Sequence, residues 1–133
     1  MNQVSVYAEN RRGAFQAITG ALRSNDINIL GSVTNDSAEY GIIRMVVDKT
    51  DEAVRVLQAA GYQCKSTHVL GVELEDKVGA LDHLLLAMLE SNINIDYIYL
   101  CFNRESGKPI LVMHTEDVSE VASCIRAKGF DVV

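Results

Sequence analysis

The chain has 133 residues, of which 48% are hydrophobic and 23% charged, so it can bury a core and is too apolar for a disordered chain. Its net charge of −6 at pH 7 repels phosphate backbones, which argues against a nucleic acid partner. No apolar run approaches the ~20 residues of a membrane helix, and no secretory signal opens the chain. We expect a small cytoplasmic protein with no membrane partner.

The first half predicts six elements from its hydrophobic periodicity. Apolar residues alternate with polar ones where a half-buried strand is expected, and recur at intervals of three and four where a helix is expected. Thr50 and Asp51 are expected to cap the second helix, and Gly61 to end it. The expected elements are a strand at 4–9, a helix at 14–23, strands at 27–33 and 40–47 joined by a turn at 35–37, a helix at 50–60 and a strand at 62–67.

The second half repeats the first. A shift of 66 residues places Gly13-Ala14 on Gly79-Ala80 and residues 27–29 on 93–95, and the shift becomes 68 beyond a longer hairpin loop at 103–109. The expected elements are a strand at 69–75, a helix at 79–91, strands at 95–102 and 109–114, a helix at 117–128 and a strand at 130–133. A duplication is therefore predicted, with domains at 1–67 and 68–133.

The order strand–helix–strand–strand–helix–strand, present twice, predicts an α+β fold of two ferredoxin-like βαββαβ sandwiches, each with an antiparallel sheet and helices on one face. The helical stripe of Leu81, Leu84, Leu85, Met88 and Leu89 is most simply core. Because a unit of about 65 residues is marginally stable alone, the halves, and two chains as a homodimer, are expected to pack together.

Catalytic and metal-binding patterns are missing from the sequence. Cys64, Cys101 and Cys124 form no CxxC pair, and their odd number indicates a reducing compartment. The three histidines share no spacing, and no phosphate-binding loop or nucleophile elbow occurs. We expect no catalytic residues, no metal and no cofactor, and hence a protein that is not an enzyme.

Two features recur at the same place in both halves. The first is the turn before the first helix, which contains Gly13 in one half and Gly79 in the other. Glycine lets a backbone or ligand approach closely, and free N–H groups at a helix start suit an anion such as a carboxylate. The second feature is Asn28 or Asn94 at the start of the next strand, with an amide that can accept from an ammonium or donate to a carboxylate. In this fold the two features are expected on neighbouring edges, where they could hold a zwitterion at both ends.

These residues resemble the ACT domains, small-molecule-binding units that regulate amino-acid metabolism, over essentially the whole chain. The first half is similar to the serine-sensing ACT domain of phosphoglycerate dehydrogenase. The resemblance implies ligand contacts from Asn10, Arg12, Gly13, Ala14, Phe15, Asn28 and Ile29 in the first half, and from Asp76, Val78, Gly79, Ala80, Leu81, Asn94 and Ile95 in the second. Because Asp76 replaces Asn10, an added carboxylate favours a ligand's ammonium, so the two sites are expected to differ.

The function expected from this resemblance is that of a regulatory sensor. It would bind an amino-acid effector at the interface between ACT units, with a metabolic enzyme as a further partner. The alternative is a ligand-free interaction module that assembles a metabolic enzyme.

Overall fold

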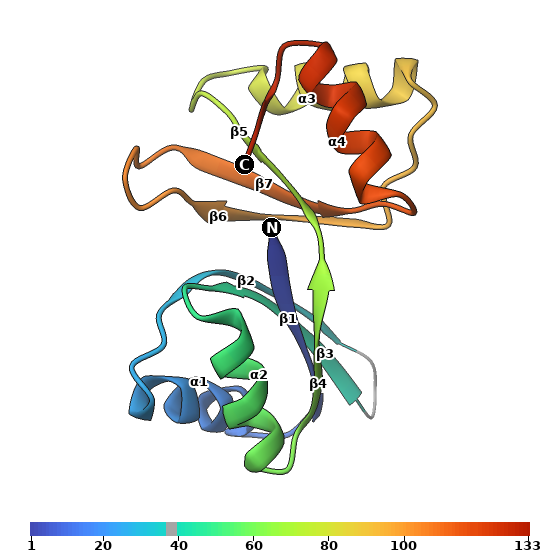
Figure 1. The fold of residues 1–133 in the computed structure, drawn as a ribbon. Helices are drawn as coiled ribbons and strands as arrows, with labels where there is room; N and C mark the ends of the chain where they lie inside the picture. Colours follow the sequence, from blue (N-terminus) through green and yellow to red (C-terminus); the bar gives the residue numbers. More distant parts are fainter. Residues whose placement is uncertain (37–39) are drawn as a thin grey trace. The chain divides into compact units, whose positions relative to one another are not determined.

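The computed structural model describes residues 1–36 and 40–133, which divide into two compact units (Figure 1). One unit comprises residues 2–67, and the other comprises residues 68–133 together with Met1. Met1 belongs to the second unit, where its terminal amino group donates to the Val69 carbonyl at 3.2 Å and its carbonyl accepts from the Val69 N–H at 3.0 Å. Ser37, in the expected hairpin turn, lies outside the described residues.

The first unit has the predicted βαββαβ order. Its strands lie in the order β2-β3-β1-β4, so that β2 and β4 form the edges. Strand β3 is antiparallel to both β1 and β2, with Val6 opposite Ile43 and Thr34 also opposite Ile43 from the other side. The elements are β1 Asn2–Glu9, α1 Ala14–Ser24, β2 Ile29–Asp36, β3 Tyr40–Val47, α2 Thr50–Ala59 and β4 Gln63–His68.

The second unit repeats this arrangement, with strand order β6-β7-β5-β8 and antiparallel pairing throughout. The α+β class and the tandem ferredoxin-like fold are thus confirmed. Strand β6 begins two residues later than expected, and β5 ends two residues earlier. The elements are β5 Leu70–Glu73, α3 Ala80–Glu90, β6 Tyr97–Phe102, β7 Pro109–His114, α4 Val118–Ala127 and β8 Asp131–Val132.

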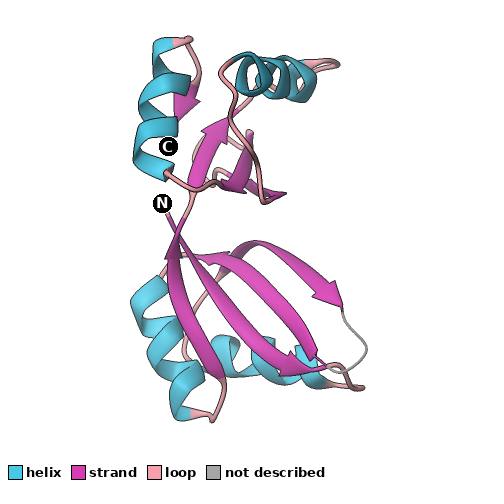
Figure 2. Cartoon of the chain, turned by 90° about the vertical axis from the view of Figure 1, so that its right-hand side faces the viewer, coloured by secondary structure: helices cyan, strands magenta, loops and turns pink. Residues whose placement is uncertain are grey.

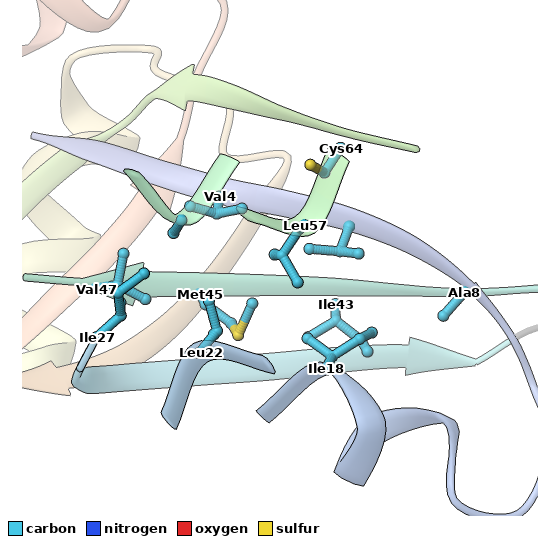
Figure 3. Close-up of a cluster of buried hydrophobic side chains, with 12 residues drawn as sticks. Val4, Ala8, Ile18, Leu22, Ile27, Ile43, Met45, Val47, Leu57 and Cys64 are labelled. Atoms are coloured by element: carbon cyan, nitrogen blue, oxygen red, sulfur yellow. The ribbon is translucent and has the colours of Figure 1, made fainter. Parts of the chain in front are cut away.

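Each unit has its own hydrophobic core between its sheet and its two helices, which cover one face of that sheet (Figure 2). In the first unit, Ile18 and Leu22 of α1 and Leu57 of α2 are fully buried against strand residues such as Met45 (Figure 3). In the second unit, the buried core includes Leu84 and Met88 of α3. The alternating strand residues predicted from the sequence supply the other side of each core.

Two local predictions are wrong. Helix α2 begins at Thr50 with Lys49 as its N-cap, and no side chain of the described residues caps it with a hydrogen bond. The Lys49 ammonium instead donates to the Asp26 carbonyl at 2.8 Å. In α3, Leu84 and Met88 are buried as expected, but Leu81, Leu85 and Leu89 are 43%, 37% and 74% exposed. The apolar stripe is therefore wider than the surface of α3 that the second unit covers.

Candidate functional site

The turns before α1 and α3 have the same backbone geometry. Gly13 and Gly79 are the N-caps of these helices, with φ of +82° and +87°, the left-handed region that favours glycine. Among the described residues, no side chain caps either helix. The first N–H groups of a helix lack partners inside the helix and carry its positive dipole end, so both turns suit an anionic group.

The turn in the first unit forms part of a small cleft of about 160 Å³. Of the predicted contacts, Asn10, Ala14 and Phe15 line this cleft, and Thr34 and Gly41 come to it from the neighbouring strands. Arg12 and Gly13 lie on the same turn but do not line the cleft, and both are exposed. The Arg11 guanidinium pairs with the Glu9 carboxylate at 3.4 Å on the rim.

The turn in the second unit forms part of a larger cleft of about 480 Å³. Of the predicted contacts, Val78, Gly79 and Ala80 line it, whereas Asp76 and Leu81 are exposed beside it. Two lysines of this cleft, Lys108 and Lys128, come from distant segments and were not predicted from the sequence. Lys77 of the turn and His83 of α3 also line the cleft, together with the acidic residues Glu73, Glu75 and Asp131.

An ion pair lies on the wall of the larger cleft. The Lys108 ammonium donates to the Glu75 carboxylate at 2.6 Å. The hydrogen bond and charge of Lys108 lower the pKa of Glu75, and Glu75 likewise raises the pKa of Lys108. The pair therefore stabilises the folded state at intermediate pH. This contribution is lost as the pH falls through the lowered pKa of Glu75, or rises through the raised pKa of Lys108.

We expect the substitution Lys108→Met to return the pKa of Glu75 towards its ordinary value, because Lys108 is the main cause of the shift. An NMR titration of the Glu75 carboxyl carbon measures this change. Lys77→Met is the matched control, since Lys77 contributes less to the same shift. An equal rise in the Glu75 pKa in the two variants would contradict this assignment.

The two asparagines lie far from the turns of their own units, contrary to the expectation of neighbouring edges. Strand β1 ends at Glu9, opposite Tyr40, whereas the Asn28 N–H donates to Asp48, which follows the other end of β3. Seven residues of strand separate these points, or roughly 23 Å. In each unit the first helix runs between the turn and the asparagine, so one unit does not bring both to a single small ligand.

Asn28 and Ile29 line none of the clefts described above, and Asn28 is exposed. Asn94 lines a separate cleft of about 360 Å³ between the end of α3 and the start of α4, while Ile95 beside it is half-buried. The Asn94 amide lies 3.5 Å from the Asp96 carboxylate, which is paired with His114 at 2.7 Å.

The second unit has an exposed apolar surface along α3 and the edge strand β6. We call this surface the α3–β6 face; its residues are Leu81, Leu85, Leu86, Leu89, Ile98, Leu100 and Phe102, each 36% to 74% exposed. Ile98 and Leu100 pair with Met113 and Leu111, which belong to the core, so they point to the side of the sheet that the helices cover. An apolar surface of this extent on one edge is typical of an interaction site.

The corresponding surface of the first unit is mostly polar, with Phe15 as the apolar counterpart of Leu81. The repeat places Thr19, Gly20 and Arg23 where the second unit has Leu85, Leu86 and Leu89, and it places Ser32 and Thr34 where the second unit has Ile98 and Leu100. The apolar edge is therefore a property of the second unit and not of the fold.

The cysteines are free thiols in the described structure. Burial raises the pKa of Cys101 to about 11 and also raises that of Cys64, so both thiols are protonated at neutral pH. Within residues 1–36 and 40–133, no three His, Cys, Asp or Glu side chains gather as a metal site requires. In the same part of the chain, no helix has the length and apolar character needed to cross a bilayer.

A duplicated ferredoxin-like fold, with a glycine at the turn before the first helix of each repeat, defines a pair of small βαββαβ domains. The family model described as "ACT domain pair" matches residues 1–133, so the chain belongs to the ACT domain family and the resemblance drawn from the sequence is confirmed.

Solved structures share the fold. Protein BT0572 from Bacteroides thetaiotaomicron has a TM-score of 0.90 at 23% identity, with 99% of this chain and 90% of that chain covered. The regulatory subunit of aspartate kinase from Thermus thermophilus, in a ligand-free form, has a TM-score of 0.70 at 15% identity, covering 96% and 90%. The corresponding subunit from Thermus flavus has a TM-score of 0.67 at 17% identity, covering 95% and 88%. No curated protein matches the sequence significantly.

Proposed function

We propose that this ACT domain pair is a regulatory sensor that binds an amino acid between ACT units. Ligand binding would stabilise one arrangement of the units and transmit that change to a metabolic enzyme. The observation that carries this proposal is the separation of the two recurring polar features, which lie at opposite ends of the same helix in both units. A solved neighbour described as a regulatory subunit of aspartate kinase has the same fold and supports a regulatory role.

The separation indicates how a site would be completed. When two units pack side by side through their first helices in opposite directions, the turn of one unit lies beside the asparagine of the other. An antiparallel pair of this kind has a twofold axis and forms two equivalent sites, one at each end of the paired helices.

The α3–β6 face supports a second copy of the chain as the partner of the second unit. Strand β6 is an edge strand, and an edge can add an antiparallel strand from an identical copy. The exposed side chains of this face are uncharged, so two copies would meet without like-charge repulsion. The proposed homodimer thus joins Asp76, Gly79 and Ala80 of one chain to Asn94 and Ile95 of its partner.

The chemistry of the turns suits an amino acid. The N–H groups at the start of each helix would hold the ligand carboxylate, aided in the second unit by the lysines of its cleft. Asn10 with Asn28, and Asp76 with Asn94, would orient the rest of the ligand. Asp76 adds a negative charge for the ligand ammonium, so the two kinds of site would differ in affinity.

A thermal-shift screen against the twenty amino acids tests the proposal. A ligand at 100 times its dissociation constant is expected to stabilise the protein by about 2.7 kcal/mol, which raises the unfolding midpoint by several degrees. Stabilisation by one amino acid, or by a chemically related few, would support the sensor. A flat response at millimolar concentrations would contradict it.

The variants Asn28→Ala and Asn94→Ala then locate the sites. Each is expected to remove the sites of one unit, and calorimetry would show a lower stoichiometry for the amino acid found in the screen. Asn25→Ala is the matched control, because Asn25 is an exposed amide near Asn28 whose side chain bonds to the Ala21 carbonyl. Unchanged stoichiometry in both site variants would overturn the assignment.

The α3–β6 face also favours a second candidate function, a ligand-free module that assembles a metabolic enzyme. A flat amino-acid screen, together with an enzyme bound at a fixed ratio through this face, would establish that alternative. Loss of the enzyme on Leu89→Glu substitution would identify the face as the contact.

A further inference from the structure

The cleft between the end of α3 and the start of α4 has an acidic lining and a buried hydroxyl group. Glu116, Asp117 and Glu120 line it, and its lining includes no lysine or arginine. Thr115 also lines the cleft but is only 1% exposed, and its hydroxyl has no hydrogen-bond partner among the described residues. A buried hydroxyl without a partner is costly, so this group points to a ligand that completes it.

In the first unit, a lysine side chain occupies the place that corresponds to this ligand. There the Lys49 ammonium donates to the carbonyl of Asp26 at 2.8 Å and lies 3.7 Å from the Asp26 carboxylate. Asp26 has a left-handed backbone with φ of +55°. Its counterpart in the second unit, Asn92, has φ of +56° and lines the acidic cleft, so the same carbonyl-bearing turn is present in both units.

Two positions around Lys49 differ between the units in a way that leaves room and charge for an external ammonium group in the second unit. The repeat aligns Lys49 with Asp117, and both are helix N-caps. It also aligns Val47, a core residue, with Thr115. Where the first unit has the Lys49 ammonium and a Val47 methyl group, the second unit therefore has the Asp117 carboxylate and the Thr115 hydroxyl. The second unit also has a cleft of about 360 Å³ at this place.

We propose that this cleft binds a small primary ammonium compound, which takes the place that Lys49 occupies in the first unit. The ammonium would donate to the Thr115 hydroxyl and the Asn92 carbonyl, and the carboxylates would supply the negative charge. Asn94 lines this cleft and also belongs to the proposed amino-acid site. The inference itself rests on Thr115, Asn92 and the carboxylates, and not on the Gly79 turn at the opposite end of the sheet.

The charges around the cleft favour a cation over a zwitterion. Asp117 caps α4 by accepting from the Glu120 N–H at 2.9 Å, and Asp96 is already paired with His114. The start of α4 contributes only about half a positive charge, which the carboxylates of Glu116, Asp117 and Glu120 outweigh. A ligand carboxylate would be repelled here, so a simple amine fits better than an amino acid.

Calorimetric titration of the full chain with ethanolamine tests the proposal, with choline as the matched probe. Choline has the same charge and hydroxyl but no N–H to donate. We expect ethanolamine to bind at one site per chain, and choline about tenfold more weakly or not at all. No heat from ethanolamine at millimolar concentration would overturn the proposal, as would equal binding of choline or of sodium ions. In that case a water molecule would be the hydrogen-bond partner of the Thr115 hydroxyl.

Three variants test the residues. Thr115→Val restores the residue of the first unit and is expected to weaken ethanolamine binding about tenfold. Glu120→Gln is expected to weaken binding, whereas Glu52→Gln, its counterpart in the first unit, leaves binding unchanged. Asp117→Lys is expected to abolish binding by supplying the ammonium internally. Thermal unfolding reports whether each variant folds.

Unchanged binding in folded Thr115→Val or Asp117→Lys would overturn the proposal. Asp76→Ala distinguishes this cleft from the amino-acid site, because that variant is expected to retain ethanolamine binding.

Discussion

The substitution Leu84→Ala is expected to lower the free energy of unfolding of the second unit by about 2–5 kcal/mol. Leu84 is fully buried between α3 and the sheet. Truncation to alanine removes apolar contacts and leaves a cavity, and both terms reduce stability. A unit of this size has only a small margin, so the effect is a large fraction of its total stability.

Urea unfolding, followed by amide NMR signals assigned to the second unit, measures this loss. Leu89→Ala is the matched control on the same helix, because Leu89 is 74% exposed. At concentrations too low for self-association, the control is expected to change stability by no more than about 0.5 kcal/mol. Equal losses in the two variants would contradict the assignment of Leu84 to the core and Leu89 to the surface.

The fold could be predicted from the sequence because burial leaves a periodic pattern. In strand β1 the core residues Val4, Val6 and Ala8 occupy alternate positions, although Ser5 between them is buried as well. Helix α1 buries Ile18 and Leu22 four positions apart. The duplication strengthened each assignment, because every element was seen twice. The left-handed turns were also predictable in kind, since Gly13 and Gly79 stand where a side chain would strain the backbone.

The exposed leucines of α3 show where this reasoning fails. Leu85 and Leu89 have the same character as Leu84 and Met88, but only the latter two reach the core of their own unit. An apolar residue indicates that its side chain is buried somewhere. It does not indicate whether the burial occurs in the core of its own unit or in an interface with another unit. The aligned positions Thr19 and Arg23 of the first unit contain the missing signal, because they show that the fold does not itself require apolar residues there.

Only those residues of the candidate site that are close together in the sequence could be predicted from it. Asn10 and Gly79 belong to short segments whose geometry follows from neighbouring residues. Lys108 and Lys128 reach the second cleft through strand pairing and helix docking, which no local spacing reveals. Thr115 was also missed, since a threonine at the end of a strand is unremarkable until its burial and its lack of a partner are known.

Subunit complementation tests whether the proposed amino-acid site of the second unit is shared between two chains. Both chains would have the Asn28→Ala substitution to silence the first unit. One chain would add Asp76→Ala, and its partner would add Asn94→Ala. In the proposed homodimer each site combines Asp76 of one chain with Asn94 of the other, so each variant alone has a defect in both of its sites.

Mixing the two chains is expected to restore binding. A mixed dimer has one site with both native residues and one site with neither, so random assortment restores about a quarter of the second-unit sites. Purification of the mixed dimer through two different affinity tags raises this to one site per dimer. Calorimetry with the amino acid found in the screen measures the stoichiometry directly.

Two controls make the result decisive. Each variant mixed with a differently tagged copy of itself is expected to remain without binding. A Leu85→Glu substitution in both chains places like charges on the α3–β6 face, and it is expected to abolish both the dimer and the recovery. If the mixed dimer forms but binds nothing, Asp76 and Asn94 do not act across two chains. If recovery persists without a dimer, the α3–β6 face is not the surface that joins them.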